Sequence, residues 1–229
     1  MNAALKAPIL HPVETLEPQA WLSGDAGDLA NIYQPQVNLA VWQGSLQQAL
    51  GPERAACLQH DLTALLQQQP GFRFSLMASQ EQALQRLLSS LPADIHACRG
   101  LAEYLQLTLE LFLELFEPAA VSLRLQSLRG AMCPRFHVDH VPVRLVTTLL
   151  GPATEWLPEA AVCRSALGAG GGDPCLDSSR VARMASGDLA LLKGSGWIGN
   201  EDNALVHRSP ALADQPRLFL SIDFAAAES

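Results

Sequence analysis

Three residues of this sequence could together bind a metal ion. His137 and Asp139 are two positions apart, and side chains two apart on a β-strand point the same way. A second histidine far downstream, His207, can supply a third ligand. Two imidazoles and one carboxylate on one face of an ion leave positions open on the other side, the arrangement found in non-haem Fe(II) oxygenases. The sequence therefore predicts a metal site made of His137, Asp139 and His207.

A cation follows the distal histidine. Arg217, ten residues after His207, opens the apolar segment 217–224, which is typical of a strand. If this strand pairs antiparallel with the one that ends at His207, both side chains can face the same interior. Phe219 and Ser221 then share the face of Arg217. A guanidinium group binds a carboxylate through two parallel hydrogen bonds, so Arg217 could hold an anionic ligand beside the metal.

With these residues the sequence resembles the Fe(II)/2-oxoglutarate-dependent dioxygenase superfamily, and most closely its prolyl-hydroxylase-like branch. The resemblance covers positions 120–224. Further matches are the turn Gly187-Asp188-Leu189, the early proline of His207-Arg208-Ser209-Pro210, and Arg144 and Thr147 on the strand after the metal pair. The resemblance implies Fe(II) held by His137, Asp139 and His207, 2-oxoglutarate held by Arg217, and hydroxylation of a small molecule or a protein side chain.

The whole chain also resembles an uncharacterised bacterial domain family that has the same His-Val-Asp-His and Val-His-Arg-Ser-Pro signatures. Members of that family are often encoded near zinc-homeostasis genes. One alternative is therefore a non-catalytic, cupin-like metal-binding protein in zinc or iron homeostasis. A structural jelly-roll without catalytic function is a third. The ligand types also leave zinc or manganese open in place of iron.

Four other residues could contact a substrate or the metal ligands. Arg135 and Arg144 could anchor an acidic substrate, although Arg144 could equally pair with a nearby acid. His140 follows the metal pair directly, and by strand alternation it points away from the ion, behind the ligands or into the substrate channel. Trp197 could line the mouth of the pocket, or belong to the core. The only tyrosines, Tyr33 and Tyr104, lie far upstream, so none is expected to partner Arg217.

Composition argues against several other classes of protein. A net charge of −8 with 15 Lys and Arg disfavours non-specific binding to nucleic acid or to an anionic membrane. Five scattered cysteines without a Cys-x-x-Cys pair predict neither a disulfide framework nor a zinc ribbon. Cys133, four residues before His137, could approach the metal, but its favoured interpretation is a small buried hydrophobe. The N-terminus lacks the apolar segment of a signal peptide, and the apolar stretch 101–116 contains three glutamates. We expect a cytoplasmic protein.

The first half of the chain reads as a mixture of helices and short strands. Residues 1–35 predict an irregular lead-in. Strands are then expected at 37–42 and 72–76, and helices at 52–67 and 80–91. A long helix is predicted from an N-cap at Asp94 to Glu117, ended by Pro118. Its apolar positions Leu101, Leu105 and Phe112 are expected to pack against a sheet.

From position 120 the pattern changes to short strands separated by turns. These are expected at 121–125, 137–139, 143–150, 186–192, 204–207 and 217–224. The glycine-rich segment 168–174 is typical of a loop, and such loops often act as lids. Short strands of this kind indicate a sandwich or barrel. We predict one compact α+β domain, in which 120–229 forms a double-stranded β-helix (jelly-roll) and 1–119 contributes helices packed on its sheet.

Overall fold

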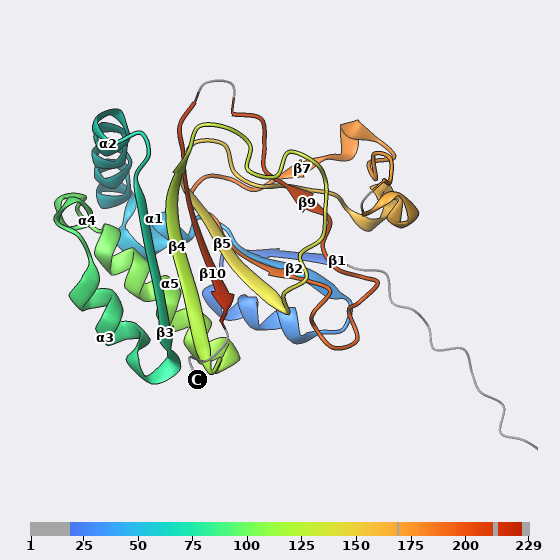
Figure 1. Ribbon diagram of the computed structural model, residues 1–229, viewed down its shortest axis with the longest axis horizontal. Helices are drawn as coiled ribbons and strands as arrows, with labels where there is room; N and C mark the ends of the chain where they lie inside the picture. Colours follow the sequence, from blue (N-terminus) through green and yellow to red (C-terminus); the bar gives the residue numbers. More distant parts are fainter. Residues whose placement is uncertain (1–18, 169, 213–214, 226–229) are drawn as a thin grey trace, which may run out of the picture.

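A large sheet, a small sheet and a layer of helices make up the chain (Figure 1). We describe the computed structural model over residues 19–168, 170–212 and 215–225. The large sheet has seven strands in the order β1-β2-β8-β5-β10-β4-β3, and the small sheet has three in the order β7-β6-β9. The strands are β1 (Gln19–Ser23), β2 (Val37–Trp42), β3 (Arg73–Ser79), β4 (Ala120–Leu128), β5 (Val143–Leu150), β6 (Glu155–Trp156), β7 (Ala182–Arg183), β8 (Leu189–Lys193), β9 (His207–Arg208) and β10 (Arg217–Phe224).

Helices cover one face of the large sheet (Figure 1). The α-helices are α1 (Ser45–Leu50), α2 (Pro52–Gln68), α3 (Gln80–Ser90), α4 (Ala93–Ala97) and α5 (Leu101–Phe116). In α5 the buried residues recur every three or four positions, which gives the helix one apolar face against the sheet. Leu101, Leu105 and Phe112 all lie in this buried core, as predicted.

The opposite face of the large sheet is turned toward the small sheet and holds the polar residues of interest. Along β10, Leu218, Leu220 and Ile222 belong to the core under the helices, whereas Phe219 belongs to a second apolar cluster on the other face. Because side chains alternate along a strand, Arg217 shares the face of Phe219. β10 is a central strand, antiparallel to both β4 and β5. Its position places Arg217 inside the molecule.

Several predicted elements are confirmed, and four are wrong. Strands β2 to β5 and helices α2 and α3 lie where the sequence indicated. The strand expected at 204–207 is present only as β9, which begins at His207. The lead-in is not irregular throughout, because β1 pairs in parallel with β2 and is followed by a 3-10 helix, η1 (Ala26–Tyr33). Positions 1–18, including the N-terminus considered for a signal peptide, lie outside the described residues. The segment around His137 and Asp139 makes a single bridge, at His137, rather than a strand.

The helix predicted from Asp94 to Glu117 is two helices. α4 ends at Ala97, and α5 starts at Leu101 after Gly100, which has φ +89°. A residue with this backbone angle cannot continue a right-handed helix, and glycine adopts it without strain. Asp94 lies inside α4, whose N-cap is Pro92. The local apolar periodicity did not reveal this break.

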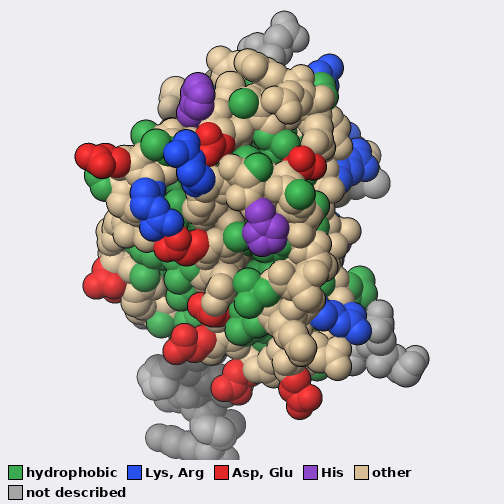
Figure 2. Space-filling model, turned by 90° about the vertical axis from the view of Figure 1, so that its left-hand side faces the viewer, with side chains coloured by type: hydrophobic (Ala, Val, Ile, Leu, Met, Phe, Trp, Pro, Cys, Tyr) green, Lys and Arg blue, Asp and Glu red, His purple; other side chains and the backbone are tan. Residues whose placement is uncertain are grey.

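The surface over the helices carries charged side chains of both signs, interspersed with apolar ones (Figure 2). This mixture is ordinary for a face in contact with water. Over the described ranges, we find no helix with the length and apolar character required to cross a membrane.

Candidate metal centre

His137 and His207 lie directly opposite each other on two neighbouring backbone segments. Each residue donates its backbone N–H to the carbonyl of the other, both at 3.0 Å. Residues paired in this way across antiparallel segments place their side chains on the same face. The two imidazole rings accordingly lie 4.6 Å apart between centroids. A single β-bridge thus places the two histidines side by side, where the sequence predicted a longer strand.

Backbone carbonyls fix the orientation of both rings. Nδ1 of His137 lies 3.0 Å from the carbonyl oxygen of Arg135, and Nδ1 of His207 lies 3.1 Å from that of Leu205. A carbonyl can only accept, so Nδ1 carries the proton in each neutral ring. Nε2 is then left with a free lone pair, which is the tautomer that binds a metal ion through Nε2.

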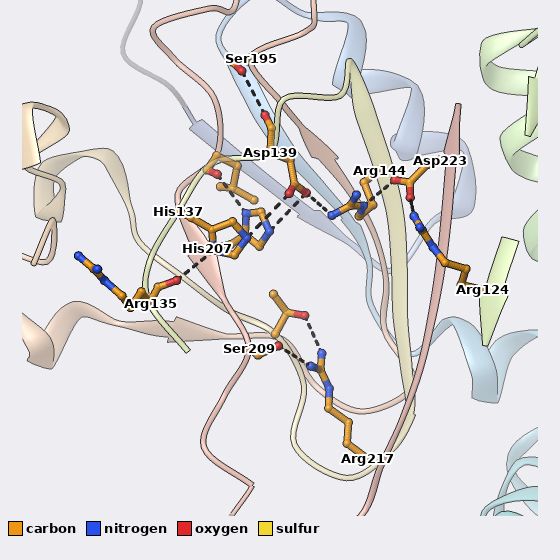
Figure 3. Close-up of polar contacts among 12 residues, drawn as sticks. Arg124, Arg135, His137, Asp139, Arg144, Ser195, His207, Ser209, Arg217 and Asp223 are labelled. Carbon is orange, nitrogen blue, oxygen red and sulfur yellow. Dashed lines mark hydrogen bonds and ion pairs between the residues drawn. The ribbon is translucent and has the colours of Figure 1, made fainter. Parts of the chain in front are cut away.

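Asp139 completes the group (Figure 3). Its carboxylate oxygens lie 3.8 Å from Nε2 of His137 and 3.5 Å from Nε2 of His207. One ligand atom from each of the three residues falls within 4.8 Å of the others. Ligands on one face of a metal ion with bonds of ~2.1 Å are ~3 Å apart, so small side-chain rotations would bring all three onto one ion.

The backbone of Asp139 is held by a tight turn that follows β8. The N–H of Ser195 donates to the Asp139 carbonyl at 2.8 Å. A Cβ atom built on Gly194 would lie 2.1 Å from the carbonyl oxygen of Val141 and 2.7 Å from that of Asp139. Only glycine therefore allows this close approach. The Gly194–Ser195 turn is a positioning element that the sequence motif did not reveal.

The side chain of Asp139 is held by Arg144 on β5. Nη1 of Arg144 donates to Asp139 at 2.8 Å, and its Nε donates to Asp223 on β10 at 2.5 Å. Arg124 on β4 also pairs with Asp223. Burial alone would lower the pKa of Arg144, but the two carboxylates raise it above its usual value. Arg144 is thus a permanent cation that connects the candidate ligand to the sheet.

His207 is electrically neutral at physiological pH. Burial lowers its pKa to about 4, although the charge of Asp139 opposes the shift and that of His137 adds to it. A neutral imidazole does not need to lose a proton before it binds a metal ion. The three side chains, two neutral nitrogens and one carboxylate, therefore fit a divalent cation.

Arg217 lies in the same region without an acidic partner among the described residues. Its side chain is buried, with 1 % of the residue exposed. Its terminal nitrogens donate to the hydroxyls of Ser209, Thr148 and Thr154 at 3.2, 3.2 and 2.9 Å, and its Nε has no partner. Burial lowers its pKa to about 10, so it stays charged at neutral pH. Its guanidinium also lies 4.4 Å from the centre of the Phe219 ring. A buried cation whose hydrogen-bond partners are hydroxyls alone is suited to receive an anion.

One cleft connects this arginine to the histidines. It is lined by twelve residues, namely Met132, Cys133, His137, Arg144, Val146, Thr154, Leu192, His207, Arg208, Ser209, Arg217 and Phe219. The cleft is narrow, about 50 Å³, so a ligand the size of a dicarboxylic acid would require its lining side chains to move. A larger hollow, about 460 Å³ beside α2, contains none of these site residues. The small cleft is the chemically relevant one.

The strand pairing that brings Arg217 to the cleft differs from the prediction. β10 does not pair with β9, because β10 lies between β5 and β4 in the large sheet and β9 pairs with β6 in the small sheet. Arg217 on β10 and His207 on β9 instead line the same cleft from the two sheets. On β5, Thr148 contacts Arg217. Thr147 alternates onto the helical face.

The other residues singled out in the sequence are spread around the centre. His140 is exposed, and its Nδ1 lies 2.9 Å from Oγ of Ser195, on the far side of the Asp139 backbone. Cys133 is exposed and lines the cleft, so its interpretation as a buried hydrophobe was wrong. Arg135 contributes its carbonyl to His137 while its guanidinium points away from the group (Figure 3).

Trp197 does not line the mouth of the cleft. Its ring packs against Tyr33 at 5.3 Å and Phe116 at 6.3 Å between centroids, and Nζ of Lys193 lies 4.8 Å from the ring centre. These neighbours belong to η1, α5 and the end of β8, on the helical side of the sheet. The alternative interpretation as a core residue is the correct one.

The structure is thus that of a mixed α/β protein with a candidate centre of two histidines and one aspartate. The chain belongs to the family described as Protein of unknown function (DUF1826), whose model matches residues 23–223. This match confirms the resemblance to an uncharacterised domain family. No curated protein matches the chain.

Solved structures of dioxygenases are similar to this chain. A dioxygenase for auxin oxidation from rice has a TM-score of 0.49 at 12 % identity, with 93 % of this chain and 84 % of that one covered. The Arabidopsis thaliana dioxygenase for auxin oxidation 1, in a complex with 2-oxoglutarate, has a TM-score of 0.47 at 8 % identity, with 93 % of both chains covered. A Pseudomonas putida prolyl-4-hydroxylase has a TM-score of 0.47 at 13 % identity, with 89 % and 99 % covered. At TM-scores below 0.5 the chemistry has to be argued from this chain's own side chains.

Proposed function

We propose that the protein is an Fe(II)- and 2-oxoglutarate-dependent oxygenase that hydroxylates a small molecule or a protein side chain. The observation that carries the proposal is the position of Arg217. A buried guanidinium without a carboxylate partner among the described residues lines the same narrow cleft as His137 and His207. An isolated buried charge is costly for a protein. A cation kept beside three candidate metal ligands is explained if an anion binds between them.

Each residue has a distinct role in this proposal. His137, Asp139 and His207 would hold iron, and Arg217 would hold the distal carboxylate of 2-oxoglutarate with help from the hydroxyls of Thr154 and Ser209. When bound, the iron and the oxo acid supply oxidative decarboxylation coupled to hydroxylation of a substrate C–H bond. Arg144 keeps one oxygen of Asp139 engaged, which orients the carboxylate toward the histidines.

We also propose that the protein has a double-stranded β-helix core and is located in the cytoplasm. The two facing sheets support a double-stranded β-helix core in 120–229, with 1–119 as the supporting segment. Three strands of that segment, β1, β2 and β3, extend the large sheet. All five cysteines are free thiols, which suits a reducing cytoplasm and a ferrous centre.

The test is metal analysis followed by titration with the oxo acid. The protein is purified anaerobically and its metal content measured. The Fe(II) protein is then titrated with 2-oxoglutarate while the metal-to-ligand charge-transfer band of a chelated oxo acid is followed. We expect stoichiometric iron and a saturable band. Bound metal without a band at millimolar oxo acid would favour the non-catalytic metal-binding protein, and absence of both would favour a structural jelly-roll.

A further inference from the structure

A second hollow lies next to the metal cleft. It measures about 340 Å³ and is lined by Pro134, Arg135, Phe136, Gly171, Gly172, Asp173, Pro174 and Arg208. Arg208 also lines the metal cleft, so the two spaces adjoin at this side chain. Two residues of its wall are sequence neighbours of candidate ligands: Phe136 precedes His137, and Arg208 follows His207. A molecule in this hollow would be next to the metal centre.

Arg135 presents a free guanidinium to this hollow. Its only hydrogen bond from that group within the described residues goes to the carbonyl of Gly171, at 3.2 Å. The backbone carbonyl of the same residue holds the ring of His137, so the side chain is anchored at its base and extends away from the metal group (Figure 3). A neutral carbonyl leaves the positive charge uncompensated.

Arg208 is the second cation and is partly neutralised. Its Nε donates to Glu155 at 2.7 Å, and its guanidinium lies 4.1 Å from the centre of the Phe136 ring. Glu155 is buried and also accepts from Arg183 at 3.2 Å. Its charge is therefore shared between two arginines. Among the described residues no hydrogen bond engages the two terminal nitrogens of Arg208.

The charged side chains around the hollow have a net charge of +1. Three arginines (Arg135, Arg183 and Arg208) stand against two carboxylates, Glu155 and Asp173. Arg144, which the sequence offered as a second anchor for an acidic substrate, is already held between Asp139 and Asp223. A single excess positive charge fits a monoanion such as a carboxylate better than a phosphate dianion.

We infer that this hollow binds the carboxylate of a small monoanionic substrate between Arg135 and Arg208, with the remainder of the molecule directed along Arg208 into the metal cleft. This anchor is separate from Arg217, which lines the metal cleft and does not line this hollow. That the bound molecule is a substrate rests on the proposed oxygenase function, whereas its binding to the hollow does not.

The experiment measures binding without turnover. The full chain is loaded with Zn(II), which is diamagnetic, and saturated with 2-oxoglutarate so that Arg217 is occupied. Benzoate and N-acetylglycine are then titrated by saturation-transfer NMR, each beside its uncharged amide. We expect both acids to bind at least about tenfold more tightly than their amides. Arg135→Gln and Arg208→Gln should each weaken the acids about tenfold or more, the loss of a charge-assisted hydrogen bond.

Controls separate this inference from general electrostatics and from the oxygenase proposal. Arg73→Gln, on the exposed edge strand β3, removes the same charge elsewhere and should leave binding unchanged. Equal binding of acids and amides, or undiminished binding in Arg135→Gln, overturns the inference. Stronger competition by inorganic phosphate than by the acids overturns the choice of a monoanion. If the wild-type protein binds neither acid while its Fe(II) form shows the oxo-acid band, this inference alone is refuted. If it binds the acids but its Fe(II) form shows no band, the oxygenase proposal alone is refuted.

Discussion

The guanidinium of Arg144 donates to Oδ2 of Asp139 at 2.8 Å and thereby connects a candidate metal ligand to the central strands of the large sheet. On its other side Arg144 contacts Asp223, whose side chain is 4 % exposed. A carboxylate buried to this degree needs a nearby cation. Arg144 therefore serves two carboxylates at once, one in the sheet and one in the site.

Replacement of Arg144 should destabilise the fold more than replacement of its neighbour. Arg144→Ala leaves Asp223 with only Arg124, and we expect the free energy of unfolding to fall by about 3 kcal/mol. Arg124 is more exposed, at 45 % of its side chain, so Arg124→Ala should cost no more than about 1 kcal/mol. Urea denaturation of the metal-free proteins measures both. Equal losses would show that Arg144 has no special role in compensating the buried charge.

Asp139 should matter for metal binding far more than for folding. Asp139→Asn keeps the shape of the side chain and removes its charge. We expect Mn(II) affinity, measured by calorimetry as a stand-in for Fe(II), to fall at least about 100-fold. Loss of an outer partner of a metal ligand already costs up to about 100-fold, and loss of a ligand's charge should cost more.

His140→Ala is the matched control for Asp139→Asn. His140 follows the same motif but contacts Ser195 instead of the candidate ligands. Its replacement should leave Mn(II) affinity unchanged. Undiminished affinity in Asp139→Asn would mean that the metal binds elsewhere.

The sequence indicated the candidate ligands because two of the three lie close together in it. The spacing of His137 and Asp139 and the offset from His207 to Arg217 are visible in the sequence, and so is the strand 217–224 that carries Arg217. The structure brings His137, His207 and Arg217 to one cleft and places Asp139 beside the two histidines, although His137 and Asp139 do not lie in a strand.

What the sequence could not predict depends on contacts between distant segments. Asp223 becomes the partner of Arg144 only because β10 lies beside β5, and the hydroxyls around Arg217 come from three separate segments. The sequence leaves Trp197 equally suited to a pocket or to the core, and only the packing of η1 and α5 against its ring decides between them. Gly194 is a local feature of the sequence whose role depends on the fold, because its lack of a side chain allows the approach of the Asp139 backbone.

Acid should destabilise the metal-free protein through His207. Burial lowers the pKa of this residue from 6.5 to about 4 in the folded state, so the unfolded chain takes up the proton at a higher pH than the folded protein does. Stability should therefore be fully present above pH ~6.5, fall as the pH decreases, and level off near pH ~4. At 1.4 kcal/mol for each pH unit the total loss is roughly 3 kcal/mol.

His207→Gln tests the source of this pH dependence. Glutamine is polar but does not titrate, so the variant should lose the component between pH ~4 and ~6.5 while keeping any contribution from the carboxylates. Urea denaturation across this range gives the slope for both proteins. An unchanged slope in the variant would assign the acid sensitivity to other groups.

Replacement of Arg217 should weaken oxo-acid binding without weakening the fold. The lowered pKa of about 10 means that burial disfavours its charge by roughly 3 kcal/mol. Arg217→Met removes this charge and retains most of the volume. The metal-free variant should therefore be as stable as the wild type or up to about 2 kcal/mol more stable. Its affinity for 2-oxoglutarate should fall at least ~30-fold, from loss of a charge-assisted bidentate contact, while iron binding stays nearly unchanged.

Arg164→Met is the matched control for that variant. Arg164 is a half-buried arginine that already pairs with Glu159, at 2.6 Å. Its replacement should lower stability by about 1 kcal/mol and leave oxo-acid affinity intact. Arg217→Lys adds a second comparison, since it keeps the charge but loses the planar fork, and should recover only part of the affinity. A stability loss of several kcal/mol in Arg217→Met, with the charge-transfer titration unaltered, would make Arg217 a structural residue and leave the oxo acid without its proposed anchor.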